Sequence, residues 1–288
     1  MVSGAVQPSC ERRQVDCIPD RRDLRCWWLH PSAGPHMAHH PTFTLSEELT
    51  LYDPMVSVRS FRASDAEGAP CLLLFPRVDR FHEKRQRWFE ADVRAMPRVE
   101  HPCYLGPRAS HHGAQHWLRL DPFEGQPIAD RLLAGPSPAL AAAVGAQLCS
   151  VASAFVAAGE PFPDVETHTL LVSPADRVAL LPTFRVAKHA EYPSYTHMPE
   201  LGFSDGDDEE GLVFHLGTVV MNLACLDRRA WLGLFVGRRG RWDRTDAEWP
   251  TDIALLETPV VQATGPRGQR PGLRELEMTL ARLATELG

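Results

Sequence analysis

The stretch from Gly159 to His189 places few potentially reactive side chains on a regular pattern of turns and apolar runs. Asp164 lies near its start, ahead of two short apolar runs, 170–172 and 178–181, that a turn separates. A carboxylate supplies the oxygen ligands that hard cations prefer. Thr183 follows the second run and carries a neutral hydroxyl. The stretch therefore combines a strand–turn–strand frame with few reacting groups.

A second acidic group precedes the apolar run 211–226 and consists of Asp207, Asp208, Glu209 and Glu210. These carboxylates could hold a cation, but a loop this acidic is more often simply solvated. They also suit the positive end of a helix dipole. The helix-dipole and solvated-loop interpretations are compatible, and both are favoured over a cation site.

Two groups of metal-ligand residue types give no metal prediction. The first lies near the N-terminus, without a C-x2-C pair, and comprises Cys10, Cys17, Cys26, His30, His36, His39 and His40. The second group, His111, His112 and His116, is expected at a solvated hairpin tip. We therefore expect neither a metal nor a cofactor.

The composition excludes several classes of protein. The chain has 288 residues, of which 44% are hydrophobic and 23% charged, as in ordinary globular proteins. A net charge of −7 argues against nucleic acid as a partner. No apolar run approaches the roughly 20 residues of a membrane span, and no signal core is evident. Seven irregularly spaced Cys indicate reduced thiols, so we expect a cytoplasmic protein.

The first half of the chain reads as a sheet with one inserted helix. Residues 1–41 lack periodicity and are predicted to be a disordered leader, with Met37 as a candidate start. Apolar or alternating runs separated by turn residues predict strands from 43 to about 75. Three- and four-residue spacing predicts a helix in 81–99. Further strands are expected at 103–107 and 116–123.

The second half is predicted to be mainly helical. Ser137 is a suitable N-cap before Pro138, and Gly159 is a suitable stop for the long helix between them. Residues 211–226 are apolar nearly all round, which predicts a helix buried in the centre of the protein. Residues 271–288 predict an amphipathic C-terminal helix.

This order of elements, over about residues 43–288, resembles the protein kinase fold. The resemblance implies a two-lobed α+β fold, with a small antiparallel-sheet N-lobe carrying one helix (42–121) and a shortened, mainly helical C-lobe (122–288). Its motifs follow in the family's order: "DVRAMPRVEHPCYL", "HWLRLDPFEGQPIADRL", "YTHMPE" with Met198, Pro199 and Glu200, "LVFHLGTVVMNLACL" with Val213, Leu216 and Gly217, and "RGQRPGLRELEMTL" with Arg270.

The resemblance also implies what this chain has lost. Asp164 matches the family's catalytic base, but Thr169 falls on one magnesium ligand, an Asn, and Thr183 on the other, an Asp. A one-residue shift would place Pro182 on that Asp instead, and neither residue is an anionic ligand. Asp92 falls on the ion-pairing Glu of the first lobe. The phosphate-gripping Lys of the third strand is replaced by one of three leucines, Leu72, Leu73 or Leu74, and the first hairpin, 49–58, has no Gly. These positions are therefore expected to be vestigial.

The resulting interpretation is a degenerate member of the serine/threonine kinase family, a bacterial-looking pseudokinase. It would act as a protein-binding regulator or scaffold, with an active kinase or its substrate as the natural partner, and with neither nucleic acid nor membrane. The resemblance implies a structural ion pair between Glu200 and Arg270. Two alternatives stay open: an atypical phosphotransferase or nucleotidyl transferase that uses Asp164, and an α+β protein outside the kinase family.

Overall fold

The computed structural model describes residues 43–52, 58–77, 82–112, 116–132, 137–184, 208–224 and 254–288, together with Gly135 and Gly206. The chain divides into two compact units, residues 1–38 and 39–288, and all described residues belong to the second. The predicted leader, 1–41, lies outside the described residues.

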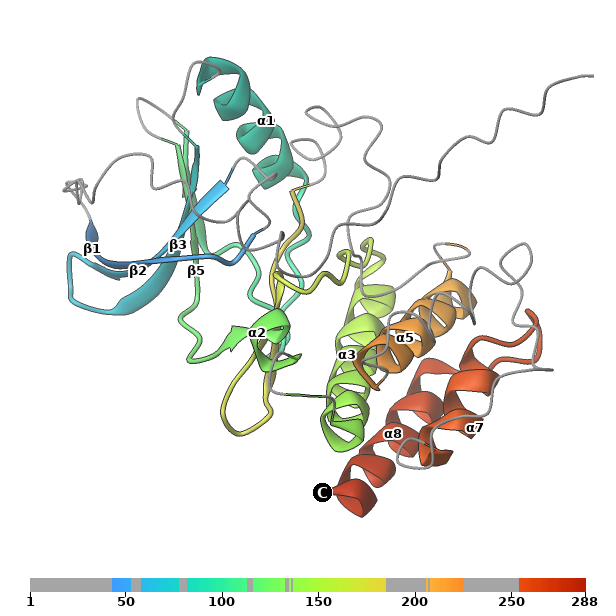
Figure 1. The fold of residues 1–288 in the computed structure, drawn as a ribbon. Coiled ribbons are helices and arrows are strands. Elements are labelled where there is room, and N and C mark those ends of the chain that lie inside the picture. Colours follow the sequence, from blue (N-terminus) through green and yellow to red (C-terminus); the bar gives the residue numbers. More distant parts are fainter. Residues whose placement is uncertain are drawn as a thin grey trace, which may run out of the picture. The chain divides into compact units, whose positions relative to one another are not determined.

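The described part of the chain is a mixed α+β structure with a five-stranded antiparallel sheet (Figure 1). The strands lie in the order β1 (Phe43–Leu49), β2 (Val58–Asp65), β3 (Pro70–Pro76), β5 (Trp117–Leu120) and β4 (Ala109–His111). The strands predicted from 43 to about 75 and at 116–123 are therefore confirmed.

The strand predicted at 103–107 is wrong. Tyr104 forms isolated bridges with His101 and with Leu180, the last residue of strand β8 (Val178–Leu180), but no strand. The Leu105 amide donates to the Leu180 carbonyl (2.9 Å), and the Leu180 amide donates to the Cys103 carbonyl (2.8 Å). Because β8 takes these backbone groups, the strand that pairs with β5 forms later, at β4.

The two faces of the sheet bury different side chains. Successive residues of a strand point to opposite faces. Leu72 and Leu74 of β3 pack with Phe89 of helix α1 (His82–Ala95), whereas Leu73 packs with Phe43 on the other face. Helix α1, which the spacing predicted, thus covers the face that Leu72 and Leu74 share.

A second, smaller sheet joins β6 (Gln126–Pro127), β7 (Leu170–Val172) and β8, and helix α2 (Ile128–Leu132) follows β6 directly. Gln147, in helix α3 (Pro138–Ala158), connects this sheet to the helical part of the molecule. Its side-chain amide donates to the Asp176 carbonyl (2.8 Å) and accepts from the Val178 amide (2.9 Å). The β7–β8 turn is thereby fixed to the helical part of the molecule.

Four helices form the remaining core: α3 (Pro138–Ala158), α5 (Glu209–Ala224), α7 (Ala254–Ala263) and α8 (Leu273–Leu287). Helix α3 begins and ends as predicted, because the Ser137 hydroxyl accepts from the Leu140 amide and Gly159 adopts φ 67°. A Cβ at Gly145 of α3 would lie 2.3 Å from Val220 of α5. The missing side chain of Gly145 therefore leaves the space that Val220 occupies.

Helix α3 corrects the expectation about membrane-spanning length. Its 21 residues are apolar enough to span a bilayer by length and composition. The expectation that no segment approaches this length was therefore wrong. Within the described residues it is the one helix of this kind, and 61% of its most apolar window is buried inside the protein. A core helix passes the same test, and the packing of α3 against α5 and α8 is that of a core helix.

The described cysteines, Cys71, Cys103 and Cys149, are free thiols.

Candidate functional site

Three of the predicted vestigial positions lie in one folded segment. The Thr183 hydroxyl accepts a hydrogen bond from the Asp164 amide (3.0 Å) although the two residues are 19 positions apart. Thr169 is 1% exposed, and its hydroxyl accepts from the Glu166 amide (3.2 Å). The Leu181 amide donates to the Thr169 carbonyl (2.9 Å). The segment following α3 is therefore folded back against the end of β8.

Thr183 contributes no charged group to the described part of this segment. The hydroxyl of Thr183 is neutral and already accepts from a backbone amide. Phe184, the next residue, is buried and stacks on Phe89 of α1, with ring centroids 5.3 Å apart. Thr183 thus brings no negative charge beside Asp164, whereas a hard cation requires carboxylate or carbonyl oxygens.

Asp92 and two of the three candidate leucines, Leu72 and Leu74, lie on the α1 side of the sheet. Asp92 is 4% exposed in α1, between the buried residues Phe89 and Val93. Leu74 is fully buried in the same apolar cluster as Phe89 and Val93. Leu72 and Leu74, two of the residues that the resemblance offered for the position of the Lys, have apolar side chains shielded from solvent. Leu73 is the weaker candidate, because it faces the opposite side of the sheet.

Tyr52 is a residue of this region that the sequence analysis did not single out. Its hydroxyl donates to the Pro182 carbonyl (3.0 Å), and its ring meets Phe184 edge-on at a centroid distance of 5.2 Å. Burial raises the pKa of Tyr52 well above its usual range, and the neighbouring Tyr104 and Glu166 raise it further. No spacing rule identifies such a residue, because its partners lie 130 positions away in sequence.

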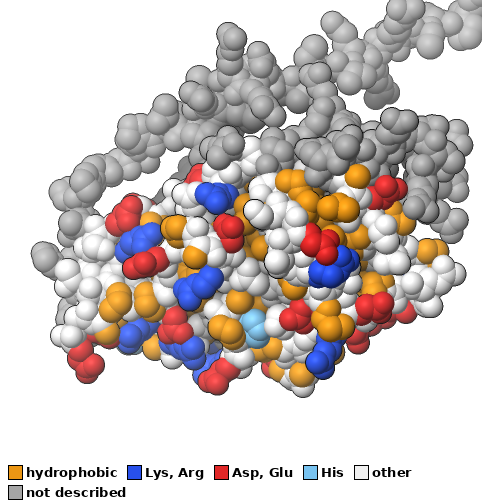
Figure 2. All heavy atoms as spheres, turned by 90° about the horizontal axis from the view of Figure 1, so that it is seen from below, with side chains coloured by type: hydrophobic (Ala, Val, Ile, Leu, Met, Phe, Trp, Pro, Cys, Tyr) orange, Lys and Arg blue, Asp and Glu red, His pale blue; other side chains and the backbone are white. Residues whose placement is uncertain are grey.

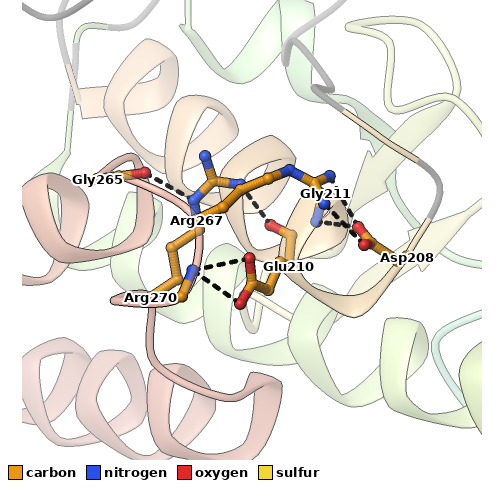
Figure 3. A network of polar contacts seen from close by, with 7 residues as sticks. Asp208, Glu210, Gly211, Gly265, Arg267 and Arg270 are labelled. Atoms are coloured by element: carbon orange, nitrogen blue, oxygen red, sulfur yellow. Dashed lines mark hydrogen bonds and ion pairs between the residues drawn. The ribbon is translucent and has the colours of Figure 1, made fainter.

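The acidic residues Asp208, Glu209 and Glu210, called the acidic clamp below, accept hydrogen bonds from the segment 267–273. Figure 3 shows Asp208 and Glu210 with this segment. Asp208 accepts two hydrogen bonds from the Arg267 guanidinium (2.8 and 2.9 Å). Glu210 accepts from the Gly268 amide (3.0 Å), and Glu209 accepts from the Leu273 amide (3.1 Å) at the start of α8. Each carboxylate of the clamp therefore has a donor in the segment 267–273.

The acidic clamp also caps α5, as the helix-dipole interpretation predicted. The Gly211 amide donates to the Asp208 carboxylate (2.9 Å). The Arg267 hydrogen bonds, followed by that from the Gly211 amide, lower the pKa of Asp208 to about 2. Because these carboxylates hold donors of the protein itself, the clamp is a poor candidate for a cation site. Asp207 lies outside the described residues.

Arg270, one member of the predicted ion pair, is half-buried beside the clamp. Its guanidinium donates to the carbonyls of Gly265 (2.7 Å) and Glu210 (3.0 Å) and lies 4.8 Å from the centre of the Phe214 ring. Glu200 lies outside the described residues, as do Met198 and Pro199. The Glu200–Arg270 ion pair therefore stays a prediction.

The three histidines lie on both sides of the turn between β4 and β5, and the residues of the turn, 113–115, lie outside the described ranges. His111 ends β4 and stacks on Trp117, with centroids 5.9 Å apart, and His112 faces His116 at 5.7 Å. Within the described ranges, no group of three or more His, Cys, Asp or Glu is arranged to hold a metal ion. The cysteines and histidines of the N-terminal group lie outside those ranges.

Comparison with protein-family models and with curated proteins found no match to this chain.

Proposed function

We propose that this chain is a catalytically inactive protein kinase-like module that acts as a protein-binding regulator or scaffold. Its partner is another protein, such as an active kinase or the substrate of one, and it works in the cytoplasm. The proposal joins a kinase-like order of elements to a site whose reacting groups are replaced.

The arrangement of the described elements supports the proposal of a kinase-like fold. A five-stranded antiparallel sheet carries one helix, α1, on one face, and a mainly helical half follows. The contact between the Asp164 amide and the Thr183 hydroxyl joins two positions that the motif alignment assigned independently. Phe184 packs against α1, which suits the residue that follows the family's magnesium ligand.

The proposed lack of catalytic activity rests on the environment of Thr183. Kinases transfer a phosphoryl group mainly by positioning it and by neutralising its charge with metal ions and a Lys. Here a neutral hydroxyl bonded to a backbone amide stands at the assigned metal-ligand position. On β3, Leu72 and Leu74 are buried among apolar side chains. The carboxylate of Asp164 cannot replace the charge neutralisation that the Lys and two metal ions supply in kinases.

The surface chemistry supports a protein partner over nucleic acid. On the face seen in Figure 2, acidic and basic side chains are interspersed with small apolar groups among the coloured residues. Nucleic acid binding relies on clustered cations that neutralise phosphates, and the whole chain carries a net charge of −7. A mixed surface of this kind is compatible with binding another protein by shape.

A nucleotide thermal-shift assay tests the proposal. The chain is heated with millimolar ATP in the presence and absence of Mg²⁺ or Mn²⁺. We expect no metal-dependent rise in Tm, because the assigned metal ligands and the Lys are replaced. Asp164→Ala should behave like the parent chain, and Asp130→Ala provides a control for loss of an exposed carboxylate. A metal-dependent shift that Asp164→Ala abolishes and Asp130→Ala retains would instead favour the phosphotransferase alternative.

A further inference from the structure

Tyr52 extends from the end of β1 into the apolar cluster beneath the sheet. It is 5% exposed and shares this cluster with side chains of α1, β3 and β8. The ring edge meets Phe184, and the hydroxyl reaches the Pro182 carbonyl. Tyr52 therefore connects the first strand of the sheet to the segment that holds Thr183.

The backbone before Tyr52 is fixed by Ser60 of β2. The Ser60 hydroxyl donates to the Leu49 carbonyl (2.7 Å) and accepts from the Leu51 amide (3.4 Å). Ser60 is itself 1% exposed. These two bonds turn the end of β1 inward, so the position of the Tyr52 ring follows from the local structure as well as from its own contacts.

The phenol of Tyr52 is held as a neutral hydrogen-bond donor. Burial, followed by the influence of Tyr104 and Glu166, raises its pKa, so the hydroxyl keeps its proton at neutral pH. A buried hydroxyl without a partner would be costly, and the Pro182 carbonyl supplies the acceptor. The surroundings thus match one flat ring bearing one donor.

We propose that Tyr52 is a built-in occupant of a ring-sized binding site between the sheet and residues 182–184. The site selects a planar aromatic ring that carries one O–H or N–H donor directed at the Pro182 carbonyl. In the native chain the site is filled from within, which keeps free aromatic ligands out. That Tyr52 keeps out the base of a nucleotide rests on the proposed function. The complementarity of the site to a phenol does not.

The test replaces the ring and supplies it again in solution. Tyr52→Ala should lower Tm by on the order of 10 °C, because a buried aromatic side chain is lost. The probe is p-cresol, which has the same ring and hydroxyl as the tyrosine side chain. At about ten times its Kd, p-cresol should raise the Tm of Tyr52→Ala by about 3–5 °C, as expected for a ligand that binds only the folded state. Toluene, which lacks the hydroxyl, should bind the same variant more weakly.

Two controls separate this site from general effects. The parent chain should show no rise with p-cresol. Phe61→Ala removes a half-buried ring from the other face of the sheet and should likewise show none. If Tyr52→Ala does not fold alone, Tyr52→Leu keeps much of the apolar volume and should show a smaller rise with p-cresol.

The proposal is overturned if p-cresol stabilises neither Tyr52 variant, or if it raises the Tm of the parent chain or of Phe61→Ala equally. Toluene binding as tightly as p-cresol would remove the role of the Pro182 carbonyl. These outcomes are independent of the proposed function, which fails instead if the parent chain binds ATP in a metal-dependent manner.

Discussion

The apolar cluster around Phe184 and the acidic clamp around Arg267 both join segments far apart in sequence, but they use opposite chemistry. The first joins residues 43–123 to the β7–β8 hairpin through buried rings and leucines. The second joins the start of α5 to the loop before α8 through carboxylates, a guanidinium and backbone amides. The Asp208 and Arg267 side chains of the clamp are 58% and 43% exposed.

This difference predicts unequal contributions to stability. Burial of an aromatic ring removes apolar surface from water and leaves a cavity when it is reversed. Exposed ion pairs contribute little, because water and salt screen them. The apolar cluster should therefore dominate the free energy of unfolding, and the clamp should respond more to salt and pH.

The largest expected effect comes from Phe184→Ala. This change removes a ring that contacts both Phe89 and Tyr52, and we expect it to lower the free energy of unfolding by about 3–5 kcal/mol. Phe61→Ala is the matched control, because that ring is only half-buried, and it should cost about 1–2 kcal/mol. Urea unfolding measures both. Equal losses would show that the cluster around Phe184 does not hold the two segments together.

An intermediate effect is expected for Arg270→Ala. Arg270 gives hydrogen bonds to two carbonyls and lies over the Phe214 ring, so its removal should cost about 2–3 kcal/mol. If the predicted pair with Glu200 forms, Glu200→Ala should be similarly destabilising. The double variant should then be more stable than the sum of the single losses implies, by at least about 1 kcal/mol. Additive losses in urea unfolding would argue against the ion pair, and with it against part of the kinase-like interpretation.

The smallest effect belongs to Asp208 and appears at acid pH. Its folded-state pKa, about 2, lies below the value of a free Asp, so its stabilisation is present above about pH 4 and is lost as the pH falls toward 2. The Tm difference between the parent chain and Asp208→Asn should therefore shrink over this range. It should also shrink in 1 M salt at neutral pH, since the pair is exposed.

Asp130→Asn, an exposed change on α2, should show neither dependence. A constant Tm difference for Asp208→Asn from pH 5 to pH 2 would mean that its carboxylate does not act through charge.

Much of the local structure was readable from the chain because short-range rules decide it. Ser137, Pro138 and Gly159 define α3 through bonds within a few residues. The leucines of α8 repeat at helical spacing, and Leu273, Leu276, Leu280 and Leu283 are buried as that spacing predicts. Short-range rules fail for residues 103–107, which were predicted as a strand. Their backbone partners are in β8, some 75 positions later in the sequence.

By itself, the sequence predicted the helices α1, α3, α5 and α8 and most of the strands, but it did not predict α7. Only the tertiary structure decided that Thr183 bonds the Asp164 amide, that the acidic clamp binds 267–273, and that Tyr52 lies against Phe184. The physical reason is the distance along the sequence between the residues that interact. Caps and periodic apolar faces depend on neighbours along the chain, whereas these contacts depend on how separate elements pack, and no single residue carries that information.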